Sequence, residues 1–332
     1  MTMSLPISRR AAVLIAGAGA GLAAPHIARA ADALTVRCDF APWGIQAALH
    51  LAQVKGWFRE ADLTVDVQDG RGSGNTLQLV NAGQVDVGQI AVGLLPQARD
   101  NGATVRAFAC FGRKTDLAVM VDADGPLRAP ADFRGKTLVC FAASPWAPYI
   151  DAWLRAGGLD RTSVNLQMLD PAAIWGTYAT GRADGLMSTL PSALPSVTRQ
   201  RRSRGVLAGD AGISFPSYGL VATEATLGRK REALRRLVAT QQRAWAHLRT
   251  NVQEGVAAML SQRPDARLDP AVQREQIELT MDFFDTPATQ GKPIGWQAEA
   301  DWTAALRSLE TANAVRPGWN IASYYTNDLI GS

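Results

Sequence analysis

The chain is 332 residues long, with 47% hydrophobic and 19% charged residues and a formal net charge of +4. This length is sufficient for a full core and predicts about two domains. The three cysteines, Cys38, Cys110 and Cys140, match no zinc or redox spacing, so we expect buried free thiols. Because the chain has three histidines, a histidine-rich metal site is excluded, and we expect no metal and no cofactor.

The first thirty residues predict an export signal. Arg9 and Arg10 form a basic start, residues 11–24 are a weakly apolar run, and Ala28-Arg29-Ala30 offers a small-x-small cleavage site. The arginine pair is typical of a twin-arginine signal, but Ala12 stands where such signals carry a bulky residue, so Sec export stays open. The run is too short for a comfortable membrane span. We therefore expect a periplasmic protein that is cleaved after about Ala30.

The remaining chain is close to neutral, because the first thirty residues hold three Arg and no acidic residue. Arg199, Arg201, Arg202 and Arg204 form the one basic run, and no aromatic residues interleave it. We interpret this run as a solvated helix end and expect no nucleic-acid partner.

Strands and helices alternate over residues 34–111. The hydrophobic pattern predicts strands over 34–40, 63–68, 85–90 and 104–111, with helices over 45–52, 76–82 and 92–100 between them. This rhythm indicates a mainly parallel sheet with helices on both faces. Ligands of such sheets bind at the carboxyl ends of the strands.

The stretch most typical of a ligand site is the glycine-rich segment 70–75. Gly72 and Gly74 allow the backbone to approach a bound group closely, and Ser73 or Asn75 can cap the following helix. A helix start in this position favours an anion or a carbonyl oxygen in front of it. Taken alone, an ordinary strand-to-helix turn explains these residues equally well.

The same layout recurs about a hundred residues later in the chain. Gly83 is followed three residues on by Asp86 at the start of a strand, and Gly181 is followed by Asp184 in the same way. Residues 141–146 again lead from a strand through small residues into a helix. Two such α/β units predict two lobes that face each other, although similar units also recur by chance in α/β proteins.

The second lobe is predicted to hold strands over 137–142, 163–169 and 184–189 and helices over 146–156, 172–180 and 191–203. A strand over 217–222 then returns to the first lobe. Helical periodicity runs from Thr226 past Trp245, and two more helices are expected over about 270–283 and 296–313. The expected boundaries are 31–117 plus 218–332 for lobe 1 and 118–217 for lobe 2.

Several stretches resemble a known family of binding proteins. They are Ala47 to Ala52, Lys55 to Phe58, Gly72-Ser73-Gly74, Gln78 to Val80, Ala82 to Gly88, Asp132 to Thr137, Gly181 to Asp184 and Gly219 to Thr223. In content and order they are similar to the substrate-binding proteins of the NMT1/THI5-like, SsuA/TauA family, over nearly all of the mature chain. The resemblance implies a type II periplasmic-binding-protein fold, in which two doubly wound α/β lobes are joined by crossover strands near 116–121 and 216–221.

The resemblance also implies an ABC importer, with its membrane permease and ATPase as partners, and we expect a monomeric binding protein. The family covers pyrimidine precursors of thiamine, aliphatic sulfonates, nitrate and aromatic acids. Members that make the thiamine pyrimidine from an active-site His carry a cysteine-rich iron motif, which is absent here. A hydrolase or transferase on the same sheet would need a Gly-x-Ser-x-Gly elbow or paired carboxylates, so we expect no enzyme. A regulatory protein without a transported ligand is a third alternative.

The residues predicted to line the cleft follow the predicted strand ends. They are Pro42, Trp43, Gly72, Ser73, Gly74, Asn75, Gln89, Ile90, Ser144, Trp146, Thr189, Ser214, Phe215 and Tyr218. The aromatic members suit a flat ring, which gains about 0.5–1.5 kcal/mol per good stacking contact. Trp175 is expected in the core rather than in the cleft. For Asp210, a turn is favoured over contact with a ligand amino group.

No Arg or Lys falls at a predicted strand end, which favours a neutral or singly charged ligand over a dianion. We therefore predict a protein that captures a small ligand between two lobes by hinge closure. The expected ligand is a pyrimidine, such as a thiamine precursor, or a similar small heteroaromatic. The alternative is a sulfonate or taurine, nitrate or an aromatic carboxylate.

Overall fold

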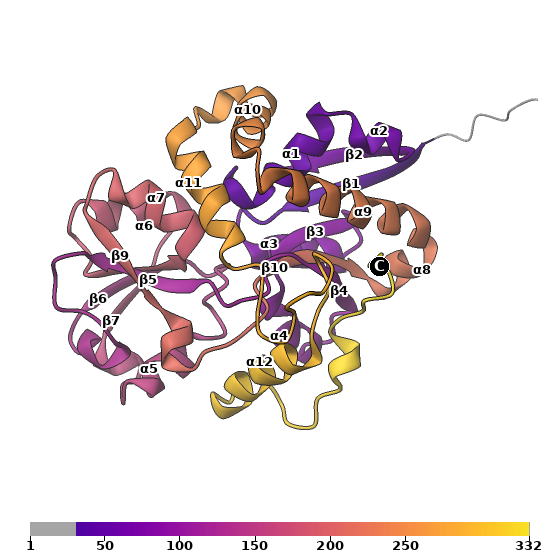
Figure 1. Ribbon diagram of the computed structural model, residues 1–332. Coiled ribbons are helices and arrows are strands. Elements are labelled where there is room, and N and C mark those ends of the chain that lie inside the picture. Colours follow the sequence, from indigo (N-terminus) through magenta and orange to yellow (C-terminus); the bar gives the residue numbers. More distant parts are fainter. Residues whose placement is uncertain (1–30, 332) are drawn as a thin grey trace, which may run out of the picture. The chain divides into compact units, whose positions relative to one another are not determined.

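Two five-stranded sheets organise the chain in the computed structural model, which describes residues 31–331 (Figure 1). The predicted export signal lies outside the described residues. Sheet A has the order β2-β1-β3-β10-β4. Its strands are β1 (Asp32–Cys38), β2 (Leu63–Gln68), β3 (Val87–Ala91), β4 (Val105–Cys110) and β10 (Tyr218–Thr223). Sheet B has the order β7-β6-β8-β5-β9. Its strands are β5 (Leu117–Asp122), β6 (Thr137–Cys140), β7 (Asn165–Met168), β8 (Gly185–Thr189) and β9 (Ser203–Leu207).

One strand in each sheet runs against its neighbours. β10 is antiparallel to β3 and β4, and β5 is antiparallel to β8 and β9. β10 follows all of sheet B in the chain and yet completes sheet A, so the chain crosses between the sheets twice. This confirms the predicted type II fold with two doubly wound lobes. We call the elements around sheet A lobe 1 and those around sheet B lobe 2; the exact boundary residues stay a prediction.

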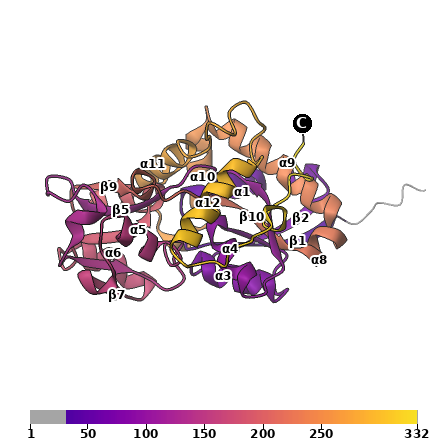
Figure 2. The same ribbon diagram turned by 90° about the horizontal axis from the view of Figure 1, so that it is seen from below.

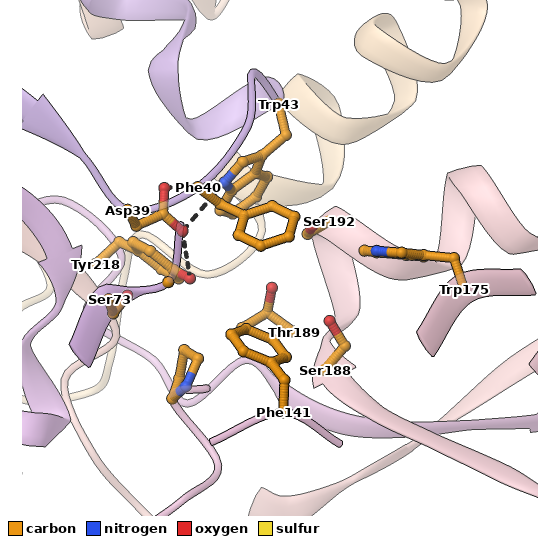
Figure 3. A pocket seen from close by; sticks show the side chains of 12 residues that line it. Asp39, Phe40, Trp43, Ser73, Phe141, Trp175, Ser188, Thr189, Ser192 and Tyr218 are labelled. Carbon is orange, nitrogen blue, oxygen red and sulfur yellow. Dashed lines mark hydrogen bonds between the residues drawn. The ribbon is translucent and has the colours of Figure 1, made fainter. Parts of the chain in front are cut away.

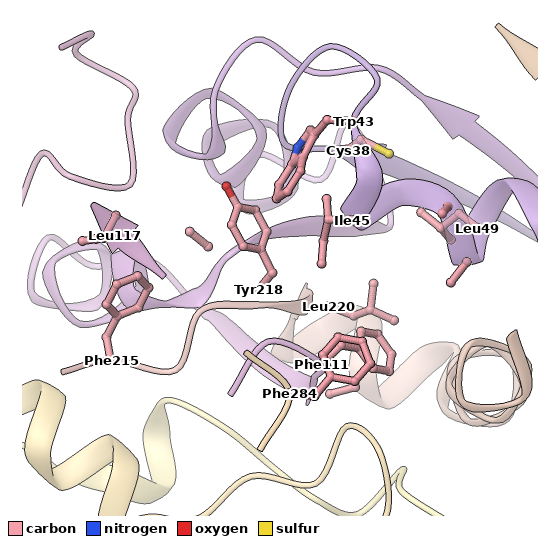
Figure 4. Packing of buried hydrophobic residues seen from close by; sticks show 14 of the residues in the cluster. Cys38, Trp43, Ile45, Leu49, Phe111, Leu117, Phe215, Tyr218, Leu220 and Phe284 are labelled. Carbon is pink, nitrogen blue, oxygen red and sulfur yellow. The ribbon is translucent and has the colours of Figure 1, made fainter. Parts of the chain in front are cut away.

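Helices cover both faces of sheet A. On one face lie α1 (Ala47–Val54), α9 (Arg231–Leu248) and α10 (Val252–Gln262), and on the other α3 (Ser73–Asn81), α4 (Leu95–Asp100) and α12 (Glu299–Thr311). Figure 2 shows α3 and α9 on opposite sides of the sheet. Along β10, Leu220 packs beside Phe111 and Phe284 in one cluster (Figure 4), while Val221 enters the other, as the two-residue period of a strand requires.

Sheet B is covered in the same way. The α6 (Pro171–Ala179) and α7 (Leu190–Thr198) helices lie on one face, and α5 (Ile150–Ala156) lies on the other (Figure 1). The α11 helix (Pro270–Met281) packs against α7 of lobe 2. The short helices α2 (Trp57–Glu60) and α8 (Glu224–Arg229) belong to lobe 1. No helix within residues 31–331 is long and apolar enough to cross a membrane.

Two local predictions were wrong. The α3 helix begins at Ser73 after Gly72 and not at Thr76, and no side chain caps it, because the Ser73 hydroxyl instead accepts a hydrogen bond from the Ala91 N–H at 3.1 Å. The helix predicted over 191–203 ends at Thr198, and its last predicted residue begins strand β9. This edge strand is rich in polar residues, and its pairing with β5 is what makes it a strand.

The three cysteines are buried free thiols, as predicted. A different buried group marks the crossings between the lobes. Asp116 is 3% exposed, just before β5, and accepts a hydrogen bond from the Ser217 hydroxyl, just before β10. Ser217 also donates its N–H to Gly112 O at 2.7 Å. These bonds hold the two crossings side by side.

The Asp116 carboxyl has no ion pair with a Lys, Arg or His among the described residues. Burial raises its pKa to about 7, and the nearby Asp39 carboxylate adds to this increase while the Ser217 hydrogen bond opposes it. The pKa of this carboxyl is 3.8 in the unfolded chain and about 7 in the folded protein. Its contribution to the folding free energy is therefore fully present below pH 3.8 and is lost as the pH rises through about 7.

The Asp116→Asn variant should therefore be more stable than the wild type at pH 8. Asn keeps the size and the hydrogen-bonding capacity but never ionises, so the gain in unfolding free energy should reach up to about 4 kcal/mol at pH 8 and disappear near pH 4. Denaturant unfolding at several pH values measures this difference. The control Asp66→Asn removes an exposed carboxylate from β2. A difference for Asp116→Asn that is constant with pH would contradict the assignment.

Candidate functional site

A pocket with about 20 Å³ of free space lies where strand ends from both sheets meet (Figure 3). Lobe 1 contributes Asp39, Phe40, Trp43, Gly72, Ser73 and Tyr218. Lobe 2 contributes Phe141, Pro145, Trp175, Ser188, Thr189 and Ser192. Five of these residues directly follow or end a strand, as expected for a doubly wound α/β fold: Asp39, Phe40, Phe141, Ser188 and Thr189.

Asp39 is the one ionisable acid in this lining, and three neutral donors hold its carboxylate. The Tyr218 hydroxyl donates to Oδ2 at 3.0 Å, and Trp43 Nε1 donates to Oδ1 at 3.1 Å and to Oδ2 at 3.3 Å. Gln46 Nε2 approaches Oδ1 at 3.5 Å. Burial raises the pKa of Asp39 to about 6, against the opposing effect of these hydrogen bonds. The hydrogen bonds thus fix the orientation of the carboxylate but do not neutralise its charge.

Aromatic rings from both lobes form the walls. Phe40 of lobe 1 and Phe141 of lobe 2 have ring centroids 5.7 Å apart, and Trp43 meets Tyr218 edge-on at 5.2 Å. Figure 3 shows the rings of Phe40 and Phe141 between the Asp39 carboxylate and the Trp175 ring. A flat ring placed among these side chains would contact aromatic surfaces from both lobes.

Trp175, expected in the core, lines the pocket and also packs half-buried against the hydrophobic cluster of lobe 2. The α6 helix buries Ile174 and Tyr178, four residues apart, and Trp175 is half-buried on the side of the helix that faces the pocket. One residue along a helix turns a side chain by about 100°, so this difference is a matter of helical phase.

Hydroxyl groups of lobe 2 complete the pocket. Ser188 and Thr189 end β8, and Ser192 follows in α7. Their side-chain oxygens make no hydrogen bond to another described residue, and Figure 3 shows the hydroxyls of Ser188 and Thr189 directed toward the open space. They are available to donate to or accept from a ligand.

The glycines of segment 70–75 contact the other lobe. Gly74 donates its N–H to Ala143 O at 3.2 Å. A Cβ atom at Gly72 would lie 2.7 Å from the Ala143 Cβ, and one at Gly74 would lie 3.3 Å from the Ala143 Cα. Gly72 also has a φ of 122°, which side chains rarely adopt. The close backbone approach predicted for these glycines is made to Ala143 of lobe 2.

The predicted site residues fall into three groups. Trp43, Gly72, Ser73, Thr189 and Tyr218 line the pocket. Pro42, Gly74, Asn75 and Ser144 line grooves next to it. Gln89, Ile90, Trp146 and Phe215 are packed in the interior, and Ser214 lines none of these spaces.

Trp146 and Phe215 have structural partners in the interior. Trp146 donates Nε1–H to Ser188 O at 2.8 Å and packs edge-on against Trp153. Phe215 stacks on Tyr149 at 5.0 Å, and the Tyr149 hydroxyl donates to Gly93 O at 3.0 Å. These two aromatic residues support the walls and the lobe contact without facing the pocket.

Sequence reasoning missed Asp39, Phe40, Phe141, Ser188 and Ser192. The predicted strands ran on to 40 and 142, whereas β1 ends at Cys38 and β6 at Cys140. Asp39, Phe40 and Phe141 were therefore counted as strand residues. A polar Asp after an apolar run was the available signal for an earlier strand end.

Residues 46–254 match the model of the NMT1/THI5-like family, and the chain belongs to this family. The fold and the interlobe pocket are those of a two-lobed binding protein of the SsuA/TauA type.

Two curated relatives and one solved structure illustrate the breadth of the group. The chain is 23% identical over 245 residues to the riboflavin-binding protein RibY of Chloroflexus aurantiacus, covering 70% of this chain and 67% of that protein. It is 22% identical over 289 residues to the formylaminopyrimidine-binding protein of Halalkalibacterium halodurans, covering 85% and 86%. The periplasmic aliphatic sulphonate binding protein SsuA of Escherichia coli superposes with a TM-score of 0.65 at 17% identity, covering 88% and 91%.

The contact between Gly74 and Ala143 predicts the effect of a larger side chain. Gly74→Val should hold the lobes apart, because a branched side chain has no room against the Ala143 backbone, and should weaken ligand binding roughly tenfold, about 1.4 kcal/mol. Small-angle X-ray scattering should show a larger radius of gyration than that of the wild type.

Gly228→Val is the matched control, since Gly228 lies in helix α8 with open space around it. Circular dichroism should give wild-type helix content for both variants. Wild-type scattering and wild-type affinity in Gly74→Val would show that this contact does not limit closure.

Proposed function

We propose that this protein is the solute-binding component of an ABC importer and captures a small heteroaromatic ligand, first of all a pyrimidine such as a thiamine precursor. The observation that carries the proposal is the convergence of aromatic side chains from both lobes on one pocket that also holds a carboxylate and free hydroxyls. The formylaminopyrimidine-binding relative supports the same ligand class.

A single-ring ligand needs the two lobes to move apart. Ligand sites commonly occupy about 300–1,000 Å³, whereas the free space among these lining residues is about 20 Å³, room for about one water molecule. The rings of Phe40 and Phe141 are in direct contact, so a ligand ring would have to enter between or beside them. A bulkier solute such as riboflavin would need the grooves on either side as well.

The proposed mechanism is hinge closure without covalent chemistry. A ligand that touches Asp39 and Tyr218 of lobe 1 and Thr189 and Trp175 of lobe 2 binds the closed arrangement better than an open one, and therefore shifts the population toward it. The closed lobes would then be recognised by the membrane permease, which works with its ATPase. We place this monomeric protein in the periplasm, after removal of the predicted export signal.

An anionic ligand is the second candidate. The hydroxyls of Ser188, Thr189 and Ser192 could bind the oxygens of a sulfonate or taurine, of nitrate or of an aromatic carboxylate. No Lys or Arg lines the pocket, however, and the Asp39 carboxylate would repel such a ligand. The pocket lining also contains no His, Cys or Lys, which supports a binding protein over an enzyme.

A ligand panel tests the proposed function. The panel contains 4-amino-5-hydroxymethyl-2-methylpyrimidine, riboflavin, taurine, an alkanesulfonate, nitrate and benzoate. We expect the pyrimidine to raise the melting temperature of the wild-type protein most, since a ligand at a hundred times Kd adds about 2.7 kcal/mol to the unfolding free energy. Calorimetry should give one site per chain. Chemical turnover of any compound, or no binding of any aromatic solute, would overturn the proposal.

A further inference from the structure

The Asp39 carboxylate is buried and carries no counter-ion. It is 4% exposed, and within residues 31–331 no Lys, Arg or His lies within ion-pair distance of it. The Asp39 carboxylate in turn raises the pKa of a second buried carboxyl, Asp116. Burying a charge without a partner is costly, so this position calls for a neutralising partner that the chain itself does not provide.

The hydrogen bonds within the protein leave part of the Asp39 carboxylate unused. A carboxylate has about four acceptor positions. Tyr218 takes one position on Oδ2, Trp43 shares its single N–H between both oxygens, and Gln46 is at the 3.5 Å limit. Because Asp39 lines the pocket, the remaining acceptor capacity is available to a molecule inside it.

The three donors also orient the carboxylate. Trp43 is buried and packs edge-on against Tyr218 at 5.2 Å, so neither ring can swing away without disturbing the other. Tyr218 is the first residue of β10 and is fixed by that central strand. An acceptor held in this way recognises a donor group of matching geometry.

We propose that Asp39 accepts hydrogen bonds from the ligand, and that the ligand therefore presents an N–H edge, such as an amino group beside a ring nitrogen that can be protonated, and carries no acidic group. This inference rests on the proposed function. A carboxylate facing an N–C–NH₂ edge can form two parallel hydrogen bonds, as carboxylates do with guanidinium groups. An anion in the same pocket would bring a second negative charge next to Asp39 with no cation in the lining.

The aromatic walls complement this recognition. Phe40, Phe141 and Trp175 can contact the faces of a heterocycle, while Asp39 receives its N–H edge and the lobe 2 hydroxyls meet its other edge. A cationic or partly cationic ring is also attracted to aromatic faces. Asp39 and the aromatic walls thus attract a protonated heterocycle, and Asp39 repels an anion.

Calorimetry with a matched set of single-ring compounds tests the inference. The set is 4-amino-2-methylpyrimidine, 2,4-dimethylpyrimidine, which has the same shape without the N–H donors, and the anions benzoate and benzenesulfonate. For the wild type we expect the amino compound to bind about 10–100-fold more tightly than the dimethyl compound. The two anions should bind more weakly than either heterocycle.

The Asp39→Asn variant should lose about 10–100-fold in affinity for the amino compound and little for the dimethyl compound. Asp210→Asn is the matched control: Asp210 is an exposed acid in the turn at 208–211 and lines none of the pockets, so its removal should change neither affinity. The wild-type comparison of the two pyrimidines decides the matter even if Asp39→Asn fails to fold.

The possible failures are distinguishable. If the wild type binds the anions as tightly as the amino compound, or the two pyrimidines equally well, the role of Asp39 is overturned while the proposed binding function stands. If the wild type binds no aromatic compound of either panel, the proposed function is overturned, and the inference fails with it.

Discussion

The strand β10 is the constraint on which both lobes depend. It lies between β3 and β4 in sheet A, but the chain reaches it only after all of sheet B has been built. Removing it would separate β4 from the rest of its sheet. Its entry also lies at a crossing between the lobes, where Ser217 holds Asp116, and its first residue, Tyr218, bonds to Asp39 in the pocket. One strand therefore links the sheet, the lobe crossing and the pocket.

Two buried carboxyls determine the electrostatics in and next to this pocket. Two carboxyls, Asp39 and Asp116, are buried near each other without a counter-ion among the described residues, and burial raises the pKa of both. Such an arrangement lowers the stability of the protein at neutral pH, which is common at sites selected for binding rather than for stability. Relatives with other ligands can share the fold because the ligand is decided by a few residues at the strand ends.

The contact between the lobes depends on small residues and on backbone groups. Gly72 and Gly74 lie against Ala143, and the Tyr149 hydroxyl reaches Gly93 O. Aromatic and helix contacts add to these, since Phe40 lies against Phe141 and α11 packs on α7. Under the proposed hinge closure, a ligand would have to control the balance between these contacts and an open state.

The sequence by itself determined the fold class, the family and the order of strands and helices, since these depend on hydrophobic periodicity and on short motifs such as residues 82–88. It also placed Trp43, Ser73, Thr189 and Tyr218 at strand ends or helix starts. Only the tertiary structure decided which side chains face the pocket. Trp175 lines the pocket because a helix turns side chains by about 100° per residue, whereas Trp146 is buried in the turn before α5. Asp39 lies in the pocket because β1 ends two residues earlier than predicted. The packing of the two sheets sets that phase and those ends, and the polar Asp39 after an apolar run is a local sign of the end of β1 alone.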